Sequence, residues 1–382
     1  MKKIFFISVL CFLLLELVIN YLLMPYPGSQ SFSYLTFLFY LFSIKIYLEI
    51  VLVILILWSL ITLLKKEKSV LPIILILVCC FVYYWTNFKN TAEHRFKEPT
   101  TLMFHSADKI KQSDKLIVIG VEVDGESKAY PQPYIMYHHK IIDTIGSKII
   151  MATYCGICQT GRIYEPYIDN KFTRFRLVGI QHGNAVFEDV PTKSWWSQET
   201  GICIAGKLKG KVLKELKSQT MTLSKWTELH PKTKVMLADP ILSIRYSNFE
   251  VYEENSKSNP KIFNTSTDWK PRTFIVGIAI DQFSKAYEWE ELKKNRLILD
   301  QIGTTKIILM LSTGMKSFVA FENSRFNQIK LNEDTLFIDN TPYNMNGINL
   351  RNNKNELISL KAYREFWFSW KYANPLTLQY SP

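Results

Sequence analysis

The chain has 382 residues and a formal net charge of +12, and it is long enough for two domains of ordinary size plus an extra segment. The positive charge is spread in ones and twos, and even the Lys-rich stretch 207–217 (KLKGKVLKELK) alternates as on the solvated face of a hairpin. This pattern argues against a nucleic-acid-binding protein. Hydrophobic residues dominate the first 90 positions, whereas the remainder reads as soluble.

Three apolar runs in residues 1–90 predict an integral membrane anchor made of three transmembrane helices. The first run contains a single charge, Glu16, and exceeds the apolar core of a usual signal peptide, with no small-x-small cleavage site after it. In the second run, Lys45 and Glu49 have the i, i+4 spacing that lets them pair on one helical face. The predicted spans are about 4–24, 42–64 and 70–88.

The loops between these runs predict the orientation of the anchor. Lys2 and Lys3 precede the first span, and KKEK at 65–68 joins the second to the third, whereas the loop 25–33 has no charge. Because positively charged loops stay in the cytoplasm, three spans would place the soluble part outside the bacterial cytoplasmic membrane, on the periplasmic or extracellular side. If one run were a buried hairpin instead of a span, the soluble part would lie inside.

The soluble part contains an internal repeat. Residues 117–130 (IVIGVEVDGESKAY) match residues 274–287 (FIVGIAIDQFSKAY), so that Gly120 corresponds to Gly277. Each copy also closes alike, with a Trp followed five residues later by a Pro. A period of this length predicts a duplicated domain instead of a solenoid. The expected boundaries are a first lobe at 91–246, a linker at 247–272 and a second, degenerate lobe at 273–382.

Both lobes are expected to be mainly β within an α+β class. The VEVDGES stretch alternates around the Asp124-Gly125 pair, which is a strong hairpin signal. A short helix is predicted over 222–230, with Thr222 or Ser224 as N-cap and Pro231 just beyond its end.

A C-x-x-C motif, Cys155 and Cys158, lies within the stretch ATYCGICQTGRIY at 152–164. Gly161 and the strand-favouring residues after it place the pair in a turn between strands, in contrast to the helix N-terminus of a thioredoxin-type motif. Such a turn suits two thiolates that point at one metal ion. Because the second copy of the repeat lacks the motif, the first lobe is predicted to carry the functional site.

A metal site built on this pair needs further ligands, because no second C-x-x-C exists. We predict His138 as the third ligand and copper or zinc as the ion, since thiolate and imidazole suit both. His139, His182 and Cys203 were weighed as further ligands, but each also has a simple structural interpretation. A local disulfide is a further alternative for the cysteine pair.

Four stretches together resemble a prokaryotic family catalogued as domain of unknown function 3179. They are YHHKIID at 137–143, YCGICQTG at 154–161, DVPTKSWWSQ at 189–198 and GICIAG at 201–206. The resemblance departs from the family pattern at Tyr137, His139, Ile142 and Gly156, and it implies no activity. The positions that it implies for the site are His138, Asp143, Tyr154, Cys155, Cys158, Thr192, Trp196 and Gln198.

Three hypotheses follow for the outward-facing domain. The first is a metal site formed by Cys155, Cys158 and His138, in a metal-dependent oxidoreductase or a metal carrier, with Asp143 and Gln198 as auxiliary groups. The second is thiol–disulfide exchange by the two cysteines. The third is a non-enzymatic extracellular binding module that contains a structural disulfide.

Overall fold

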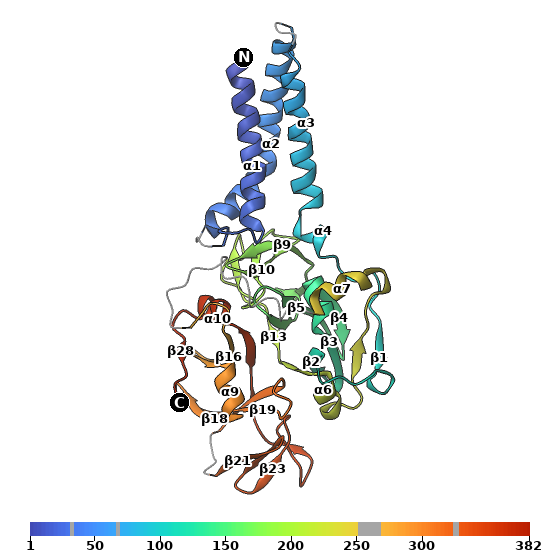
Figure 1. Cartoon of the computed structure of the whole chain (residues 1–382), viewed down its shortest axis with the longest axis vertical. Helices are drawn as coiled ribbons and strands as arrows, with labels where there is room; N and C mark the ends of the chain where they lie inside the picture. Colours follow the sequence, from blue (N-terminus) through green and yellow to red (C-terminus); the bar gives the residue numbers. More distant parts are fainter. Residues whose placement is uncertain (31–33, 66–68, 251–268, 324–327) are drawn as a thin grey trace.

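A computed structural model of the protein describes residues 1–30, 34–65, 69–250, 269–323 and 328–382. A bundle of three long helices stands on one end of a β-rich region formed by two lobes (Figure 1). The predicted linker, residues 247–272, lies mostly outside the described residues. The predicted class, a membrane segment of helices followed by a mostly β soluble part, is confirmed.

The three N-terminal helices are each long and apolar enough to cross a membrane, as the sequence predicted. Their outward-facing side chains are mostly apolar, which is the surface that a lipid bilayer requires. The helices are α1 (Lys2–Leu23), α2 (Leu35–Leu64) and α3 (Leu71–Tyr84), which the π-helical segment η1 (Trp85–Lys89) continues.

The charged residues inside the anchor bind one another. The Glu16 carboxylate accepts hydrogen bonds from the ammonium group of Lys45 at 3.0 Å, the hydroxyl of Thr86 at 2.6 Å and the amide of Asn87 at 2.8 Å. Lys45 also pairs with Glu49 at 3.3 Å, which confirms the predicted i, i+4 pair. Polar groups inside a membrane are costly unless they are paired, so this network lets the three helices pack with charges in their interior.

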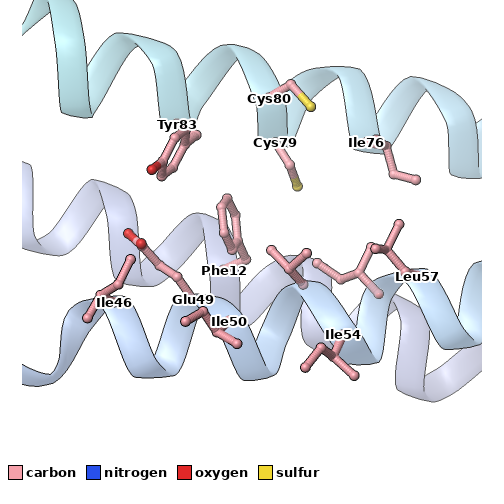
Figure 2. Close-up of a pocket in the computed structure, with 12 residues that line it drawn as sticks. Phe12, Ile46, Glu49, Ile50, Ile54, Leu57, Ile76, Cys79, Cys80 and Tyr83 are labelled. Carbon is pink, nitrogen blue, oxygen red and sulfur yellow. The ribbon is translucent and has the colours of Figure 1, made fainter.

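A cavity of about 450 Å³ lies between α2 and α3, with Phe12 of α1 at its back. Figure 2 shows the carboxyl group of Glu49 and the phenol of Tyr83 at one end, and the thiol of Cys79 pointing inward. The remaining lining is largely aliphatic. The cavity therefore presents an apolar surface with a small polar end.

The base of the anchor packs directly on the first lobe. Phe39 and Phe42 of α2 contact the ring of Trp195, with ring centroids 5.3 and 5.5 Å apart. A β-carbon on Gly179 would lie 2.4 Å from the carbonyl oxygen of Leu23 at the end of α1, so this approach requires glycine. Helix α2 begins before the predicted boundary at 42 because its first turns cover the lobe.

The first lobe contains a five-stranded sheet in the order β1-β15-β3-β2-β14. Strands β2 and β3 form the hairpin predicted at Asp124-Gly125. The predicted helix after β14 is present as α6 (Leu223–Leu229), and Thr222 caps it by accepting a hydrogen bond from the amide of Lys225. The strands of this sheet are β1 (Phe104–Ser106), β2 (Ile117–Val123), β3 (Glu126–Pro131), β14 (Ser218–Thr222) and β15 (Lys234–Met236).

Two four-stranded sheets complete the first lobe and carry the candidate site. One has the order β13-β6-β5-β4 and the other the order β12-β11-β10-β9. The first consists of β4 (Lys140–Ile145), β5 (Lys148–Cys155), β6 (Thr160–Tyr164) and β13 (Glu215–Leu216). The second consists of β9 (Phe175–Gln181), β10 (Asn184–Asp189), β11 (Trp195–Ser197) and β12 (Cys203–Ala205). Shorter elements of this lobe include α4 (Ala92–Arg95), α5 (Gln132–His138), β7 (Tyr167–Ile168), β8 (Lys171–Phe172) and α7 (Ser243–Glu250).

The second lobe has three sheets, in the orders β27-β16-β17-β28, β18-β19-β20-β26 and β21-β22-β23-β24-β25. Its helices are α9 (Trp289–Asn295) and α10 (Trp367–Ala373). The first two sheets contain β16 (Phe274–Ile280), β17 (Phe283–Glu288), β18 (Leu297–Ile302), β19 (Thr305–Leu311), β20 (Phe318–Glu322), β26 (Ser359–Leu360), β27 (Ala362–Phe366) and β28 (Leu378–Gln379). The third contains β21 (Ile329–Asn332), β22 (Thr335–Ile338), β23 (Thr341–Tyr343), β24 (Ile348–Asn349) and β25 (Lys354–Asn355).

The two lobes share a hydrophobic core. Val118 and Trp226 of the first lobe belong to one buried cluster with Ile308, Phe321 and Leu336 of the second. The burial of large apolar side chains is the main favourable term in folding, so this cluster joins the lobes into one folded unit.

Equivalent positions of the proposed repeat make equivalent contacts. The ring of Trp226 covers Gly120, and the ring of Trp370 covers Gly277, so that an added β-carbon would lie 2.4 Å from ring atoms in both places. These contacts support the internal duplication, which stays a prediction from the sequence.

The Gly120–Trp226 contact generates a test of packing. We expect Gly120→Ala to destabilise the protein by about 1–3 kcal/mol, because the methyl group must displace a buried indole. Gly314→Ala is the control, since its β-carbon would find only the hydroxyl of Ser312 at 3.9 Å. Thermal unfolding of the full chain in detergent, followed by tryptophan fluorescence, checks the difference. Equal midpoints for the two variants would contradict this account of the contact.

Candidate functional site

The C-x-x-C motif lies in the turn between β5 and β6, where the sequence predicted it. Cys155 is the last residue of β5, and Thr160 begins β6. Both sulfur atoms belong to residues with 0 % exposure, and they lie 3.2 Å apart as free thiols. The turn thus holds two thiols in contact, out of reach of bulk solvent.

The loop between β9 and β10 covers the two thiols. The carbonyl oxygen of Gly183 accepts a hydrogen bond from Cys155 at 3.3 Å and from Cys158 at 2.9 Å. The side-chain amide of Asn184 donates to the sulfur of Cys158 at 3.3 Å. The side chain of Gln30, from the loop between α1 and α2, accepts a hydrogen bond from the amide of Gly183 at 3.4 Å. The loop of the membrane anchor is therefore connected to the sulfur atoms through Gly183, which hydrogen-bonds both Gln30 and the cysteines.

The pKa values of the two thiols are shifted in opposite directions. Burial alone would raise the pKa of Cys155, but hydrogen bonds from the Cys158 thiol and from backbone amides outweigh it and lower the pKa below the usual value. Burial, together with the hydrogen bond to Cys155, raises the pKa of Cys158 well above the usual value. Cys155 is therefore the more acidic of the two thiols.

A buried carboxyl group lies next to Cys158. The Glu199 carboxylate accepts a hydrogen bond from the hydroxyl of Ser369 at 2.8 Å and from the amide of Asn184 at 3.3 Å. Ser369 also lowers the pKa of the Cys158 thiol, against the larger effect of burial. Burial and the neighbouring Glu365 raise the pKa of Glu199 well above its usual value. These effects favour the protonated, neutral form of Glu199.

The second lobe completes this site. Glu365 of β27 is fully buried and forms an ion pair with Arg162 of β6 at 2.9 Å. Among the described residues, its Oε2 atom and the Oε1 atom of Glu199 have no hydrogen-bond partner. The guanidinium group of Arg162 also stacks on the ring of Tyr363 at 3.3 Å from its centroid. The backbone amide of Phe366, the residue after Glu365, donates a hydrogen bond to the carbonyl oxygen of Cys158 at 3.0 Å. Residues more than 200 positions apart in sequence thus share one polar network.

His138, the predicted third ligand, is held elsewhere. Its Nδ1 atom contacts the carbonyl oxygen of Lys97, and its Nε2 atom lies 2.7 Å from the hydroxyl of Tyr246. The ring therefore fixes helix α5 against the N-terminal segment and α7. Within the part of the chain that the structure describes, no group of three or more His, Cys, Asp or Glu side chains is arranged to hold a metal ion. The structure does not bring His138 to the two cysteines.

The other predicted auxiliary residues divide into two sets. Asp143 forms an ion pair with Lys128 at 2.9 Å and accepts a hydrogen bond from Tyr130 at 2.7 Å, within β3 and β4. Asp300 of the second lobe makes the same two contacts with Lys285 and Tyr287. These contacts recur in a lobe without the cysteines, so Asp143 contributes to the fold.

Tyr154, Trp196 and Gln198 surround the turn that carries the thiols, whereas Thr192 contacts Asp189 and Ser194. The hydroxyl of Tyr154 accepts a hydrogen bond from Gln132 at 2.7 Å. Trp196 packs in the same buried cluster as the two cysteines, and its indole donates to Asp189, which Thr192 also contacts. The oxygen of the Gln198 amide accepts from Asn184 at 3.4 Å. These side chains shape and support the turn.

Sequence reasoning missed Asn184, Glu199, Ser369, Glu365 and Arg162. Glu199 directly follows the SWWSQ stretch, and this position next to a site motif was the available signal. Ser369 and Glu365 had none, because they belong to the lobe that lacks the cysteines.

A scan against protein families matches residues 97–377 with the family described as a protein of unknown function, DUF3179. The match covers most of the chain, so the protein belongs to this family, as the four stretches indicated. No curated protein and no solved structure matches the chain.

The buried Glu199 generates a prediction about stability and pH. The unfolded chain releases the Glu199 proton near pH 4.3, whereas the folded chain keeps it, so folded-state stability falls as pH rises above that value. We expect Glu199→Gln, a neutral mimic of the acid, to be more stable than the natural chain above about pH 5. The gap should widen by at most about 1.4 kcal/mol per pH unit and vanish at pH 3.

Thermal unfolding of the full chain between pH 3 and pH 8 measures this difference. Glu228→Gln serves as the control, because that side chain is 62 % exposed. A gap that stays constant with pH would contradict the assignment of a neutral Glu199.

Proposed function

We propose that the protein is a membrane-anchored dithiol–disulfide redox protein in which Cys155 and Cys158 form the redox pair. The observation that carries this proposal is the contact of two free thiols, 3.2 Å apart in a turn, whose pKa values are shifted in opposite directions. A cysteine that is more acidic than its neighbour is a feature of reactive C-x-x-C pairs. When the disulfide forms, the two thiols together release two electrons and two protons.

The surrounding residues fit this chemistry. Ser369 hydrogen-bonds Glu199 and acts on the pKa of Cys158, so the less acidic thiol has a buried acid close by that can exchange protons. The carbonyl oxygen of Gly183 lies within hydrogen-bond distance of both sulfur atoms and holds them close together. The sequence also predicted that the two cysteines bind copper or zinc. Such a site would need a third ligand other than His138, and the purified full chain tests it as well.

We also propose that the domain lies outside the cytoplasmic membrane. The basic residues flank the ends of α1, α2 and α3 that point away from the lobes, and such loops stay in the cytoplasm. The oxidising side of the membrane is where a protein disulfide persists.

Redox titration of the purified full chain tests the dithiol proposal. We expect Cys155 and Cys158 to be oxidised reversibly in thiol–disulfide buffers, with a midpoint above about −300 mV, as for catalytic pairs. Trapping of free thiols followed by mass spectrometry measures the midpoint, and Cys155→Ser should abolish the transition.

Two results would replace this proposal. A disulfide that resists reduction below about −300 mV would favour the structural role in a binding module. About one equivalent of copper or zinc, lost on Cys155→Ser, would favour the metal site.

The orientation has its own test. Alkaline phosphatase is active only outside the cytoplasm, so we expect activity when it is fused after Pro382 and none when it is fused after Leu64. The reverse pattern would place the domain in the cytoplasm and remove the argument from an oxidising compartment.

A further inference from the structure

A cavity of about 220 Å³ lies beside the redox pair. Its inner wall contains Asn184 and Glu199, the two side chains that separate it from Cys158. Its other walls are mostly apolar and include Ile202 and Tyr372. The cavity is therefore a pocket of small-molecule size, one side chain away from a thiol.

Two buried polar atoms of residues that line this cavity lack a hydrogen-bond partner among the described residues, Nε2 of Gln181 and Oε1 of Glu199. The side-chain nitrogen of Gln181 has no hydrogen-bond partner among the described residues, although the residue is only 6 % exposed. A buried donor without an acceptor costs about 1–3 kcal/mol, so an occupant with a suitable oxygen would recover that free energy. The unpaired donor indicates a ligand that accepts hydrogen bonds.

The lining restricts the chemistry of this ligand. Among the described residues, no Lys or Arg lines the cavity, so no side chain there neutralises a phosphate or a carboxylate. Burial and the neighbouring Glu365 favour the protonated form of Glu199, which presents a neutral acid in place of a carboxylate for a metal ion. Apolar walls with donors at one end suit a neutral ring that carries carbonyl oxygens.

The size and position of the cavity favour a small, membrane-dissolved molecule. Cys155 and Cys158 have 0 % exposure, so a reactant meets the sulfur of Cys158 only after Asn184 moves, and a molecule in the cavity already lies next to Asn184. Leu35, which lines the cavity, is the first residue of the membrane helix α2. A ligand that travels in the bilayer therefore reaches the cavity without crossing the aqueous phase.

We propose that this cavity binds the head group of a lipid-soluble quinone, which is the electron acceptor of the Cys155–Cys158 pair. This inference rests on the proposed dithiol function and names its oxidant. Gln181 and Glu199 would donate hydrogen bonds to the quinone oxygens, and Ile202 and Tyr372 would contact the ring.

The chemistry balances with these residues. The Cys158 proton goes by way of Ser369 to Glu199, which gives its own proton to a quinone oxygen. Rotation of Asn184 lets the Cys158 thiolate add to the ring and form a carbon–sulfur bond. The sulfur of Cys155 then attacks the sulfur of Cys158, and the Cys155 proton follows through Glu199 to the second quinone oxygen. The disulfide forms as the carbon–sulfur bond breaks, and the electron pair of that bond stays on the ring. The quinone therefore leaves as the hydroquinone, with two electrons and two protons from the two thiols.

The test measures disulfide formation in the reduced full chain in detergent, with a decyl-substituted benzoquinone as the probe. We expect loss of both thiols with matching hydroquinone formation. Glu199→Gln, which retains the hydrogen bond but not the transferable proton, should slow the reaction at least tenfold. Ile202→Trp, which fills the cavity from its rim, should do the same.

Val212→Trp is the matched control. Val212 forms an antiparallel β-bridge with Ile202, but it is 63 % exposed and does not line the cavity. The equilibrium midpoint in thiol–disulfide buffers, measured for every variant, shows whether each one keeps a working redox pair. A reversible midpoint without oxidation by the quinone overturns this inference and leaves the dithiol function standing. Unchanged rates in Glu199→Gln and Ile202→Trp overturn the cavity as the site. The absence of any reversible midpoint in the natural chain overturns the dithiol function itself.

Discussion

The buried ion pair between Arg162 and Glu365 is the constraint on which the candidate site depends. Removing two charges from water costs several kcal/mol for each ion, so the pair is stable only because each partner is completed by further contacts. Arg162 stacks on Tyr363, and Glu365 lies next to Glu199, whose pKa it helps to raise. The loss of one partner would leave an uncompensated charge next to the two thiols.

This pair also explains why a lobe without cysteines is part of a cysteine site. Glu365 lies on β27, and the helix that follows this strand carries Ser369, which hydrogen-bonds Glu199 and lowers the pKa of Cys158. The second lobe therefore sets the acidity of a group that the first lobe supplies. The shared hydrophobic core holds the two lobes in the relative position that this arrangement requires.

The sequence predicted the features that depend on local pattern. Runs of apolar residues defined the three membrane helices, an Asp-Gly pair marked the hairpin of β2 and β3, and strand-favouring residues around Cys155 and Cys158 placed the motif in a turn. The features that depend on long-range contacts were not predicted. His138 is close to the cysteines in sequence, but its position at the end of α5 directs both ring nitrogens to Lys97 and Tyr246. Ser369 and Glu365 reach the site only through the packing of one lobe on the other.

The short distance between the anchor and the lobe has a consequence for what the protein can meet. The absence of a side chain at Gly179 lets the end of α1 touch the sheet, and Trp195 fills the space between α2 and the lobe. No spacer separates the bilayer from the domain at this junction, so the domain has a fixed height and cannot search the compartment around it. Its encounters are confined to a thin layer at the membrane surface, where molecules diffuse in two dimensions. The reactants of such a protein are therefore molecules that lie in the membrane or at its surface.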